Sequence, residues 1–445
     1  MYALYTALSL VAFVLASPWL AWQAFRHRKY VGTIGQRLGR IPVAVNLDGE
    51  ESIWIHAVSV GEVLAARALV PGLRERYPGL KIFLSTTTRT GQHVARQNVG
   101  GLDAVFYFPL DLPAVVERFV GRLRPRLFLM VETEIWPNLL RTCRQRGVRT
   151  LLVNGRISSR SFPRYRLVRP FMRRVLADVD RLCMQTDEGA RRIVALGADP
   201  QRVVVTGSLK FDALDQPPGG PHALGRDRVL RFFRIRAGRP VVMAASTLRG
   251  EEGPVLRAFR EVRRHAADAL LVVAPRHPER FDEVVGLVRD EGFRLERRTE
   301  LAIDAEPRAD VVVLDSIGEL ARLFEIATVV FVGGSLVDAG GHNILEPAVY
   351  GKPVVFGPHM QNFAEIAEAF LANGAAVQVP SGRALTETLV ALVGDPVRRA
   401  SLGAAARALV DANRGARDRT LDAIGAVFPA ATRQGATVRP FRRVP

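Results

Sequence analysis

The chain has 445 residues, of which 48% are hydrophobic and 24% are charged, so it has the composition of a folded protein but is too long for one compact core. Its 62 Lys and Arg residues exceed its 44 Asp and Glu residues, which gives a net charge of +18 and favours anionic partners. Nucleic acid is not expected, because aromatic residues make up only 7% of the chain and no nucleic-acid-binding motif is present. An anionic phospholipid membrane surface fits this charge better. Two cysteines are too few for a disulfide framework, so we expect buried thiols at Cys143 and Cys183.

The N-terminus predicts a membrane anchor at residues 1–28. The stretch from Tyr2 to Phe25 carries no charge and, at about 1.5 Å per residue, reaches roughly 36 Å, which is enough to cross a bilayer. Basic residues from Arg26 to Lys29 follow directly, which puts the rest of the chain on the cytoplasmic side. Pro18 and several polar residues weaken the span, so a single-pass helix and a monotopic anchor both stay open.

Beyond a basic stretch at 26–42, strand-like apolar runs alternate with helical patterns. In the first half the expected strands are 52–58, 81–86, 104–106, 127–131, 150–153, 181–184 and 203–206, with helices beginning near Gly61 and Thr90. In the second half they are 241–245, 269–274, 310–314, 329–332, 353–356 and 376–379, followed by helices at about 386–414 and 417–428. This alternation predicts βαβ units and parallel sheets.

The predicted fold is therefore α/β, with two Rossmann-like domains facing a cleft, as in the GT-B glycosyltransferases, behind the anchor helix. A turn-rich segment around 215–225 separates the domains. We expect an N-terminal domain at 29–215, a C-terminal domain at 225–428 and a basic tail at 429–445. Ligands of such sheets bind outside the carboxyl ends of the strands, so polar residues that follow strands are the candidates for a site.

In the first domain, three loops after strands carry such residues. Glu62 stands at a helix start after the first cytoplasmic strand, where it is either a functional acid or only a cap of the helix. Glu132 and Glu134 follow a buried strand directly, which packing does not explain. Lys210 follows the last strand of this domain.

In the second domain, the stretch at 329–358 predicts a nucleotide-sugar site. A β-branched run ends at Gly333-Gly334, and Asn343 is expected to begin a helix whose free N–H groups bind phosphate. Glu346, one turn further, can accept hydrogen bonds from ribose hydroxyls. Two further loops after strands contain Pro275-Arg276 and Ser316 to Glu319.

Together these motifs resemble the 3-deoxy-D-manno-octulosonic acid (Kdo) transferases of lipopolysaccharide synthesis. The motifs are HAVSVGE at 56–62, ETEIWPNL at 132–139, TGSLKFD at 206–212, PRHPERF at 275–281 and GGSLVDAGGHNILEPA at 333–348. The resemblance runs from the N-terminal anchor to about residue 425. In one departure, Leu248 stands where many relatives have His, so no imidazole role is carried over to this position.

The resemblance implies an inverting GT-B glycosyltransferase of the inner membrane that moves Kdo from CMP-Kdo to the tetraacylated lipid A precursor, lipid IVA. It implies that Glu62 is the general base, kept ionised by the helix dipole, and that Glu132 and Lys210 support the transition state. The residues implied to hold CMP are Pro275, Arg276, Ile317, Gly318, Glu319, Asn343, Ile344, Leu345 and Glu346.

No separate cofactor is expected, because CMP-Kdo is itself the donor substrate. No metal ion is expected either, because helix dipoles and Arg276 or Lys210 can absorb the charge of the leaving CMP. Asp178 and Asp180 match the DxD pattern of metal-dependent transferases, but they lie far from the other motifs and we interpret them as surface residues. Two alternatives stay open: another GT-B sugar-nucleotide enzyme, such as a UDP-sugar transferase or an epimerase, and a catalytically inactive, membrane-tethered binding protein. The acids at Glu62 and Glu132 favour an enzyme. The motifs encode neither the number of Kdo residues transferred nor which of Glu132 and Glu134 is the second functional acid.

Overall fold

The computed structural model describes residues 1–27, 33–42, 45–159, 161–212 and 226–429. The predicted linker at 215–225 lies outside these residues, as do nearly all of the tail predicted at 429–445 and part of the basic stretch at 26–42. The chain divides into two compact units, one formed by residues 1–219 with 414–445 and the other by residues 220–413.

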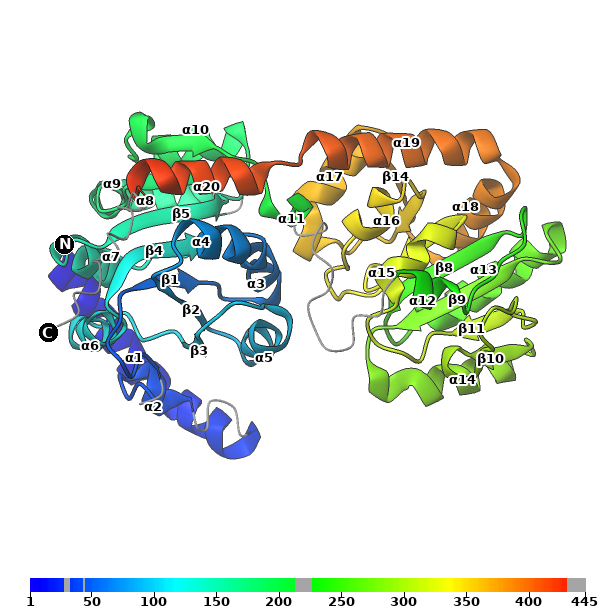
Figure 1. Ribbon diagram of the computed structural model, residues 1–445, viewed down its shortest axis with the longest axis horizontal. Coiled ribbons are helices and arrows are strands. Elements are labelled where there is room, and N and C mark those ends of the chain that lie inside the picture. Colours follow the sequence, from blue (N-terminus) through cyan, green and yellow to red (C-terminus); the bar gives the residue numbers. More distant parts are fainter. Residues whose placement is uncertain (28–32, 43–44, 160, 213–225, 430–445) are drawn as a thin grey trace, which may run out of the picture. The chain divides into compact units, whose positions relative to one another are not determined.

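The described part of the first unit contains a seven-stranded parallel sheet in the order β3-β2-β1-β4-β5-β6-β7 (Figure 1). Its strands are β1 (Ser52–His56), β2 (Lys81–Thr86), β3 (Ala104–Tyr107), β4 (Pro125–Val131), β5 (Arg149–Gly155), β6 (Arg181–Met184) and β7 (Val203–Val205). Its helices are α1 (Tyr2–His27), α2 (Ile34–Arg37), α3 (Val60–Arg67), α4 (Val70–Arg76), α5 (Arg89–Asn98), α6 (Pro113–Leu123), α7 (Pro137–Gln145), α8 (Phe162–Leu167), α9 (Arg169–Leu176), α10 (Asp187–Ala195), α11 (Leu209–Asp212) and α20 (Ala416–Val427).

Alternate side chains of these strands pack into two cores, one on each face of the sheet, as the two-residue period of a strand requires. On one face Trp54 of β1 and Phe128 of β4 pack against α6, α7, α9 and α10. On the other face Ile55 and Leu129 pack against α3, α4 and α5. Cys143 and Cys183 are buried free thiols, as expected.

The C-terminal helix α20 belongs to the first unit, although the predicted boundaries assigned residues 225–428 to the C-terminal domain. Helix α20 lies against β5 and β6 (Figure 1). Its residues Leu421 and Ile424 enter the core that also contains Leu151 and Val153 of β5. Asp212 at the end of α11 accepts hydrogen bonds from the backbone N–H groups of Gly415, at 2.8 Å, and Arg417, at 2.7 Å. This carboxylate caps α20 and ties it to the unit.

The second unit, within its described residues, holds a second seven-stranded parallel sheet in the order β10-β11-β9-β8-β12-β13-β14. Its strands are β8 (Val241–Thr247), β9 (Leu270–Pro275), β10 (Leu295–Arg297), β11 (Val311–Val313), β12 (Val329–Val332), β13 (Val354–Phe356) and β14 (Ala376–Gln378). Its helices are α12 (Arg226–Leu230), α13 (Glu252–His265), α14 (Phe281–Asp290), α15 (Leu320–Leu323), α16 (Leu345–Val349), α17 (Ala364–Ala372), α18 (Gly382–Gly394) and α19 (Pro396–Ala412).

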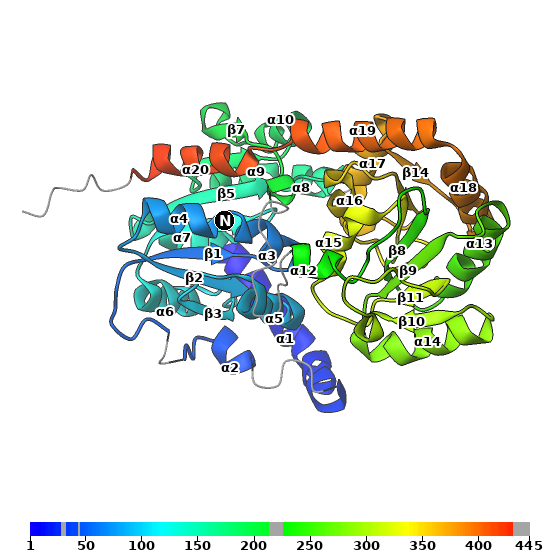
Figure 2. The ribbon, with the colours of Figure 1, turned by 45° about the vertical axis from the view of Figure 1, so that its right-hand side comes forward.

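Helices α13 and α18 lie side by side on one face of this sheet (Figure 2). Phe259 of α13 and Leu389 of α18 share a core with Phe331 of β12. The sequence predicted one helix at about 386–414, but the structure has two. Asp395 caps the second helix through the backbone N–H of Arg398, and Pro396 occupies its first turn. Proline is favoured at that position and disrupts a helix interior, so α18 ends before it.

The N-terminal helix α1 docks by its first two turns on the first unit. The Tyr2 hydroxyl donates a hydrogen bond to Asp178, at 2.5 Å, and the Tyr5 hydroxyl donates one to Asp111, at 3.0 Å. Both tyrosine rings also contact Phe171 of α9, with centroid distances of 5.9 and 5.7 Å. Asp178 therefore has a structural partner, and Asp180 likewise accepts a hydrogen bond from the backbone N–H of β5 residue Thr150.

The predicted transmembrane span at Tyr2 to Phe25 is not supported. Among the described residues, no helix combines the length and the apolar character that crossing a bilayer requires. Pro18 lies inside α1, and polar residues interrupt its apolar sequence. One face nevertheless leaves large apolar side chains in solvent: Leu4, Leu8 and Leu15 are 63%, 61% and 75% exposed.

Candidate active site

In both sheets the chain reverses its winding direction between two central strands, and these points position the candidate site residues. In the first unit the reversal lies between β1 and β4, and in the second between β8 and β12. Loops that leave two such strands diverge to opposite faces of the sheet and open a crevice where ligands bind. Glu62 follows β1, and Glu132 and Glu134 follow β4. The predicted acids of the first unit therefore converge at this reversal point, where the charges of Glu132 and Glu134 act on Glu62.

Glu62 lies in the first turn of α3 and folds back over the helix start. Its carboxylate accepts hydrogen bonds from the backbone N–H of Val58, at 2.7 Å, and from the Ser59 hydroxyl, at 2.9 Å. Ser59 is the N-cap residue, and its hydroxyl accepts a hydrogen bond from the Glu62 backbone N–H. The capping function that the sequence left open is thus present. Only 8% of the residue is exposed.

Burial raises the pKa of Glu62 from 4.5 to about 7. The hydrogen bonds from Val58 and Ser59 lower this pKa, whereas the negative charges of Glu132 and Glu134 raise it further. Burial therefore opposes the helix N–H groups that the sequence expected to keep Glu62 ionised, and removal from water is the larger of the two effects. A carboxyl with a pKa near 7 is instead matched to proton transfer at neutral pH.

Glu132 and Lys210 form an ion pair, with 3.1 Å between Glu132 Oε1 and Lys210 Nζ. Glu132 has a left-handed backbone, with a φ of 62°, as does Asn154 on β5, with a φ of 55°. Such backbone strain costs on the order of 1–3 kcal/mol and often accompanies functional sites. The buried Asn154 side chain accepts a hydrogen bond from the Leu209 backbone N–H, at 2.9 Å. Asn154 thus positions the helical turn that carries Lys210.

Glu134 is held by two aromatic rings rather than by a cation. The indole N–H of Trp136 donates to its carboxylate at 3.0 Å, and His56 Nε2 lies 3.6 Å away. His56 is fully buried, stacks on Phe108 at 3.7 Å and places Nδ1 3.0 Å from the Ser85 hydroxyl. Burial lowers the pKa of His56, so the ring is neutral at pH 7. Glu134 and Glu132 therefore occupy different surroundings although they are two residues apart.

In the second unit, Arg276 follows β9 and its side chain is exposed. The preceding residue, Pro275, is buried at the end of the strand. Burial, followed by the positive charges of Arg276 and His277, lowers the pKa of His342 to about 4. The three basic residues therefore lie close enough to interact, although they come from two loops. Because His342 with a pKa near 4 is neutral at pH 7, Arg276 supplies the permanent positive charge of this group, which supports an anion site at this edge of the second sheet.

The segment from Asn343 to Glu346 differs in detail from its prediction. Helix α16 begins at Leu345, two residues later than expected, and has only five residues. Asn343 accepts a hydrogen bond from the Leu345 backbone N–H, at 3.1 Å, and donates one to Glu346, at 3.0 Å. Ile344 and Leu345 are buried in the core. So short a helix offers a weaker anion site than the sequence indicated, because few peptide dipoles add up in it.

Residues Ile317 to Glu319 divide between exposure and burial. Ile317 is 68% exposed, and Gly318 has a φ of 89° in the loop after β11. Glu319 is only 2% exposed and pairs with the buried Arg298 at 2.6 Å. Its carboxylate also accepts a hydrogen bond from the Ser316 hydroxyl, at 2.7 Å. The Glu319 side chain therefore holds its own loop in place.

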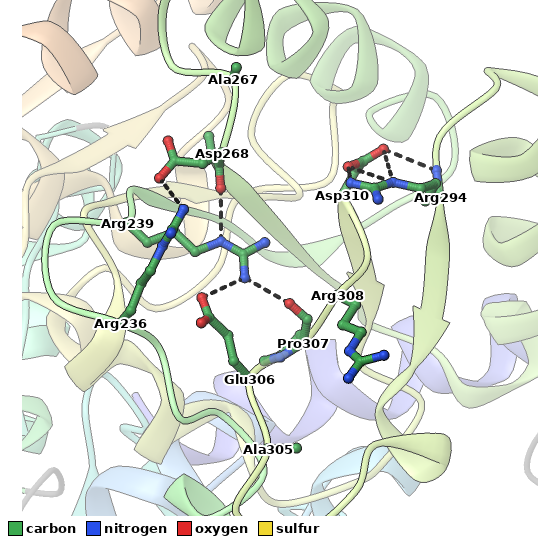
Figure 3. Close-up of a pocket in the computed structure, with 11 residues that line it drawn as sticks. Arg236, Arg239, Ala267, Asp268, Arg294, Ala305, Glu306, Pro307, Arg308 and Asp310 are labelled. Carbon is green, nitrogen blue, oxygen red and sulfur yellow. Dashed lines mark hydrogen bonds and ion pairs between the residues drawn. The ribbon is translucent and has the colours of Figure 1, made fainter.

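A hollow of about 560 Å³ in the second unit lies away from these residues (Figure 3). Its lining includes Asp268, just before β9, and Asp310, just before β11, so it opens at the amino ends of the strands. Its charged side chains are largely paired, for example Arg239 with Glu306 at 2.9 Å and Arg294 with Asp310 at 2.7 Å (Figure 3). Since ligands of such sheets bind at the opposite edge, we do not assign this hollow to the site.

Sequence reasoning did not single out His56 or Asn154. His56 is the last residue of β1, directly before the loop that leads to Glu62. Asn154 lies near the end of β5, directly after the apolar run Leu151-Leu152-Val153. A polar residue in a buried strand was the signal that marked both positions, since such residues need a partner there.

Two parallel α/β units, each with polar residues at its reversal point, define a GT-B-like protein. A putative UDP-N-acetylglucosamine 2-epimerase from Listeria monocytogenes has a similar fold, with a TM-score of 0.56 and 14% identity over 86% of this chain and 98% of that one. The family model for 3-deoxy-D-manno-octulosonic-acid transferase (kdotransferase) matches residues 32–213, and that for group 1 glycosyl transferases matches residues 227–409.

Two relatives extend the match over almost the whole chain. A 3-deoxy-D-manno-octulosonic acid transferase from Bordetella pertussis is 37% identical over 396 residues, which cover 87% of this chain and 90% of the relative. One from Haemophilus influenzae is 33% identical over 424 residues, which cover 94% and 96%. The chain therefore belongs to the Kdo transferase family of glycosyltransferases.

Proposed function

We propose that the protein transfers Kdo from CMP-Kdo to the tetraacylated lipid A precursor, lipid IVA, with Glu62 as the general base. The observation that carries this proposal is a buried carboxyl with a pKa raised to about 7, at the reversal point of the first sheet. Family membership supports the reaction type. The acceptor and the role of Glu62 follow from the resemblance of the motifs.

In the proposed step, an acceptor hydroxyl oxygen attacks the anomeric carbon of Kdo. The new C–O bond forms on the side opposite the phosphate, the bond from the anomeric carbon to the phosphate oxygen breaks, and CMP leaves with the electron pair. Ionised Glu62 takes the hydroxyl proton as the new bond forms, which contributes about 10²–10⁴ in rate. Glu132 and Lys210 add fixed, paired charges beside this carboxylate.

On the donor side, Arg276 is the residue best suited to the phosphate of CMP. It is exposed beyond β9 and needs no rearrangement to donate charge-assisted hydrogen bonds to an anion. Asn343 and Glu346 are held together by their own hydrogen bond and present polar atoms to a ribose or a base. Ile317 and Gly318 complete this surface through an exposed loop.

The protein also acts, in this proposal, at the cytoplasmic face of the inner membrane. The acceptor is a membrane lipid, and the net charge of +18 attracts anionic headgroups. The exposed apolar side chains of α1 supply a surface that can enter the headgroup region as a monotopic anchor. Leu8 and Leu15 are central to this face.

The test is a direct product assay. Purified protein is incubated with lipid IVA and CMP-Kdo, and the lipid product is identified by mass spectrometry. We expect a mass increase of one or more Kdo residues, and the same spectrum gives their number. UDP-sugars in place of CMP-Kdo test the alternative sugar-nucleotide enzymes. Binding of CMP without turnover would identify the inactive binding protein instead.

A further inference from the structure

Glu251 is a fully buried carboxylate at the start of α13, directly after the loop that leaves β8. Its side chain accepts four hydrogen bonds from backbone N–H groups. They come from Leu248 at 2.9 Å, Gly334 at 2.7 Å, Ser335 at 3.0 Å and Leu336 at 2.9 Å. Three of these donors belong to the loop that leaves β12. Glu251 therefore joins the two loops that flank the reversal point of the second sheet.

The charge of Glu251 is balanced by these N–H groups. Among the described residues, no basic side chain forms an ion pair with it. A buried carboxylate without compensation is strongly disfavoured, but several N–H donors aimed at both oxygens replace the water it has lost. Because the N–H groups of residues 334–336 donate to the Glu251 carboxylate and that of Gly333 donates to the Ala245 carbonyl, the N–H groups of this loop are not available to a ligand phosphate.

The conformation of the loop at 333–336 depends on a close approach between its backbone and the loop that leaves β8. A Cβ on Gly333 would lie 2.6 Å from the Ser246 carbonyl oxygen and 2.9 Å from the Glu251 carboxylate, so only glycine fits there. The Ser335 hydroxyl accepts a hydrogen bond from the Gly357 backbone N–H beyond β13, at 2.8 Å. The contact thus extends over the carboxyl ends of three adjacent strands.

The loop at 333–336 also supports the segment that is proposed to bind CMP-Kdo. The Gly334 carbonyl accepts a hydrogen bond from the Gly341 backbone N–H, at 2.8 Å. The His342 ring lies so close to Gly334 that a Cβ there would be 2.9 Å from it. Asn343 follows directly. A displacement of Gly334 is therefore transmitted to the segment from His342 to Glu346.

We propose that Glu251 is a positioning residue of the CMP-Kdo site. Its carboxylate occupies the backbone cradle, which is the set of N–H groups of residues 334–336 after β12, and thereby fixes the segment from His342 to Glu346. It does not touch the donor. The donor phosphate is bound by Arg276 and its neighbours, and the glycine pair at 333–334 serves the fold of the loop. This inference rests on the proposed CMP site in the second unit.

The first experiment measures Glu251→Gln, which keeps the size of the side chain but sets an amide against four N–H donors. We expect the affinity for CMP, measured by calorimetry on the full chain, to fall at least tenfold, and the KM for CMP-Kdo to rise more than kcat falls. Val288→Ala, which opens a cavity in α14 away from the site, is the control for lost stability. It should lower the melting temperature but keep the CMP affinity. Glu251→Gln with a CMP affinity within twofold of wild type would overturn the proposal.

The second experiment uses the unaltered protein and does not depend on the folding of a variant. Hydrogen exchange of the peptide at 333–337 is followed with and without CMP. We expect slow exchange in the free protein and no further slowing with CMP, because Glu251 already holds these N–H groups. Fast exchange that slows only with CMP would show that the ligand is their partner and overturn the proposal. Failure of the wild-type protein to bind CMP would count against the proposed function, while exchange in the free protein still tests the cradle.

Discussion

Glu62 combines the two roles that were alternatives from the sequence alone, a helix cap and a candidate functional acid. Its carboxylate caps α3 through Ser59 and Val58, and it also lies at the reversal point of the first sheet beside two other acids. A cap is normally exposed and strongly acidic, but here burial governs the pKa. The position of Glu62 followed from local sequence, whereas its pKa depends on side chains that only the fold brings near.

Glu62→Gln tests the chemical role. The amide keeps the size of the side chain and most of its hydrogen bonding but cannot accept a proton, so we expect kcat to fall by about 10²–10⁴ while CMP affinity and melting temperature hold. Steady-state kinetics with lipid IVA measure kcat, and calorimetry measures the CMP affinity and the melting temperature. Glu75→Gln on the exposed side of α4 is the control for loss of a carboxylate. Turnover near the wild-type rate would reduce Glu62 to a helix cap and move the search for the base to Glu132 or Glu134.

The pH dependence follows from the same residue. A general base works only when ionised, so kcat/KM should decline as the pH falls through about 7, the pKa of Glu62. The negative charge of Glu134 contributes to raising that pKa, and its removal must lower it. In Glu134→Gln we therefore expect the acidic limb of the profile to move to lower pH. A limb that stays in place in this variant would mean that another group controls it.

At the scale of elements, runs of apolar residues identified the strands inside both sheets well. The predicted ranges 81–86, 181–184 and 329–332 coincide with β2, β6 and β12, because buried parallel strands are continuously apolar. Short polar edge strands gave no such signal, and β10 at Leu295–Arg297 was not predicted. Helix ends were also less certain. α16 begins at Leu345 rather than at Asn343, and the Asn343 side chain accepts a hydrogen bond from the Leu345 backbone N–H at the start of the helix.

Helix α1 is expected to contribute to the stability of the first unit. Tyr2 and Tyr5 donate hydrogen bonds to Asp178 and Asp111, and bonds to charged groups typically contribute about 1.5–3 kcal/mol each. Deleting residues 1–28 should therefore lower the melting temperature by several degrees. It should leave CMP binding intact, because every residue predicted to bind CMP lies beyond residue 270. Differential scanning calorimetry and CMP titration measure the two effects.

A double variant, Tyr2→Phe with Tyr5→Phe, isolates the hydroxyl contribution. It retains both rings against Phe171 and removes only the hydrogen bonds, so we expect its melting temperature to fall, but by less than that of the truncated protein. An unchanged melting temperature in the truncated protein would mean that α1 does not dock in solution as it does in the structure.

At the scale of the whole molecule, local patterns could not supply the long-range pairings. Gly415, at the start of α20, lies 203 residues beyond Asp212 and follows the second unit in sequence, yet α20 completes the core of the first unit. Nothing in residues 416–427 indicates which sheet they cover. The convergence of Glu62, Glu132 and Glu134 likewise depends on the order of β1 and β4 in the sheet, which the alternation of strands and helices leaves undetermined.

The net charge of +18 makes a prediction for the full chain at a lipid surface. Long-range attraction between a cationic protein and anionic headgroups is screened within about 10 Å at 0.1 M salt, whereas apolar insertion is not. We therefore expect sedimentation with vesicles that contain anionic lipid, much weaker binding to zwitterionic vesicles, and partial but incomplete release in high salt.

The part of binding that resists salt should depend on the exposed face of α1. Leu8→Asp with Leu15→Asp places two charges on that face, and both side chains are more than half exposed, so the fold should tolerate them. We expect this variant to be released from anionic vesicles almost completely by high salt. Val397→Asp, at a site 78% exposed in the second unit, is the matched control and should behave as wild type. Equal salt resistance in the α1 variant and in wild type would exclude α1 as the apolar contact and leave charge alone to account for the association.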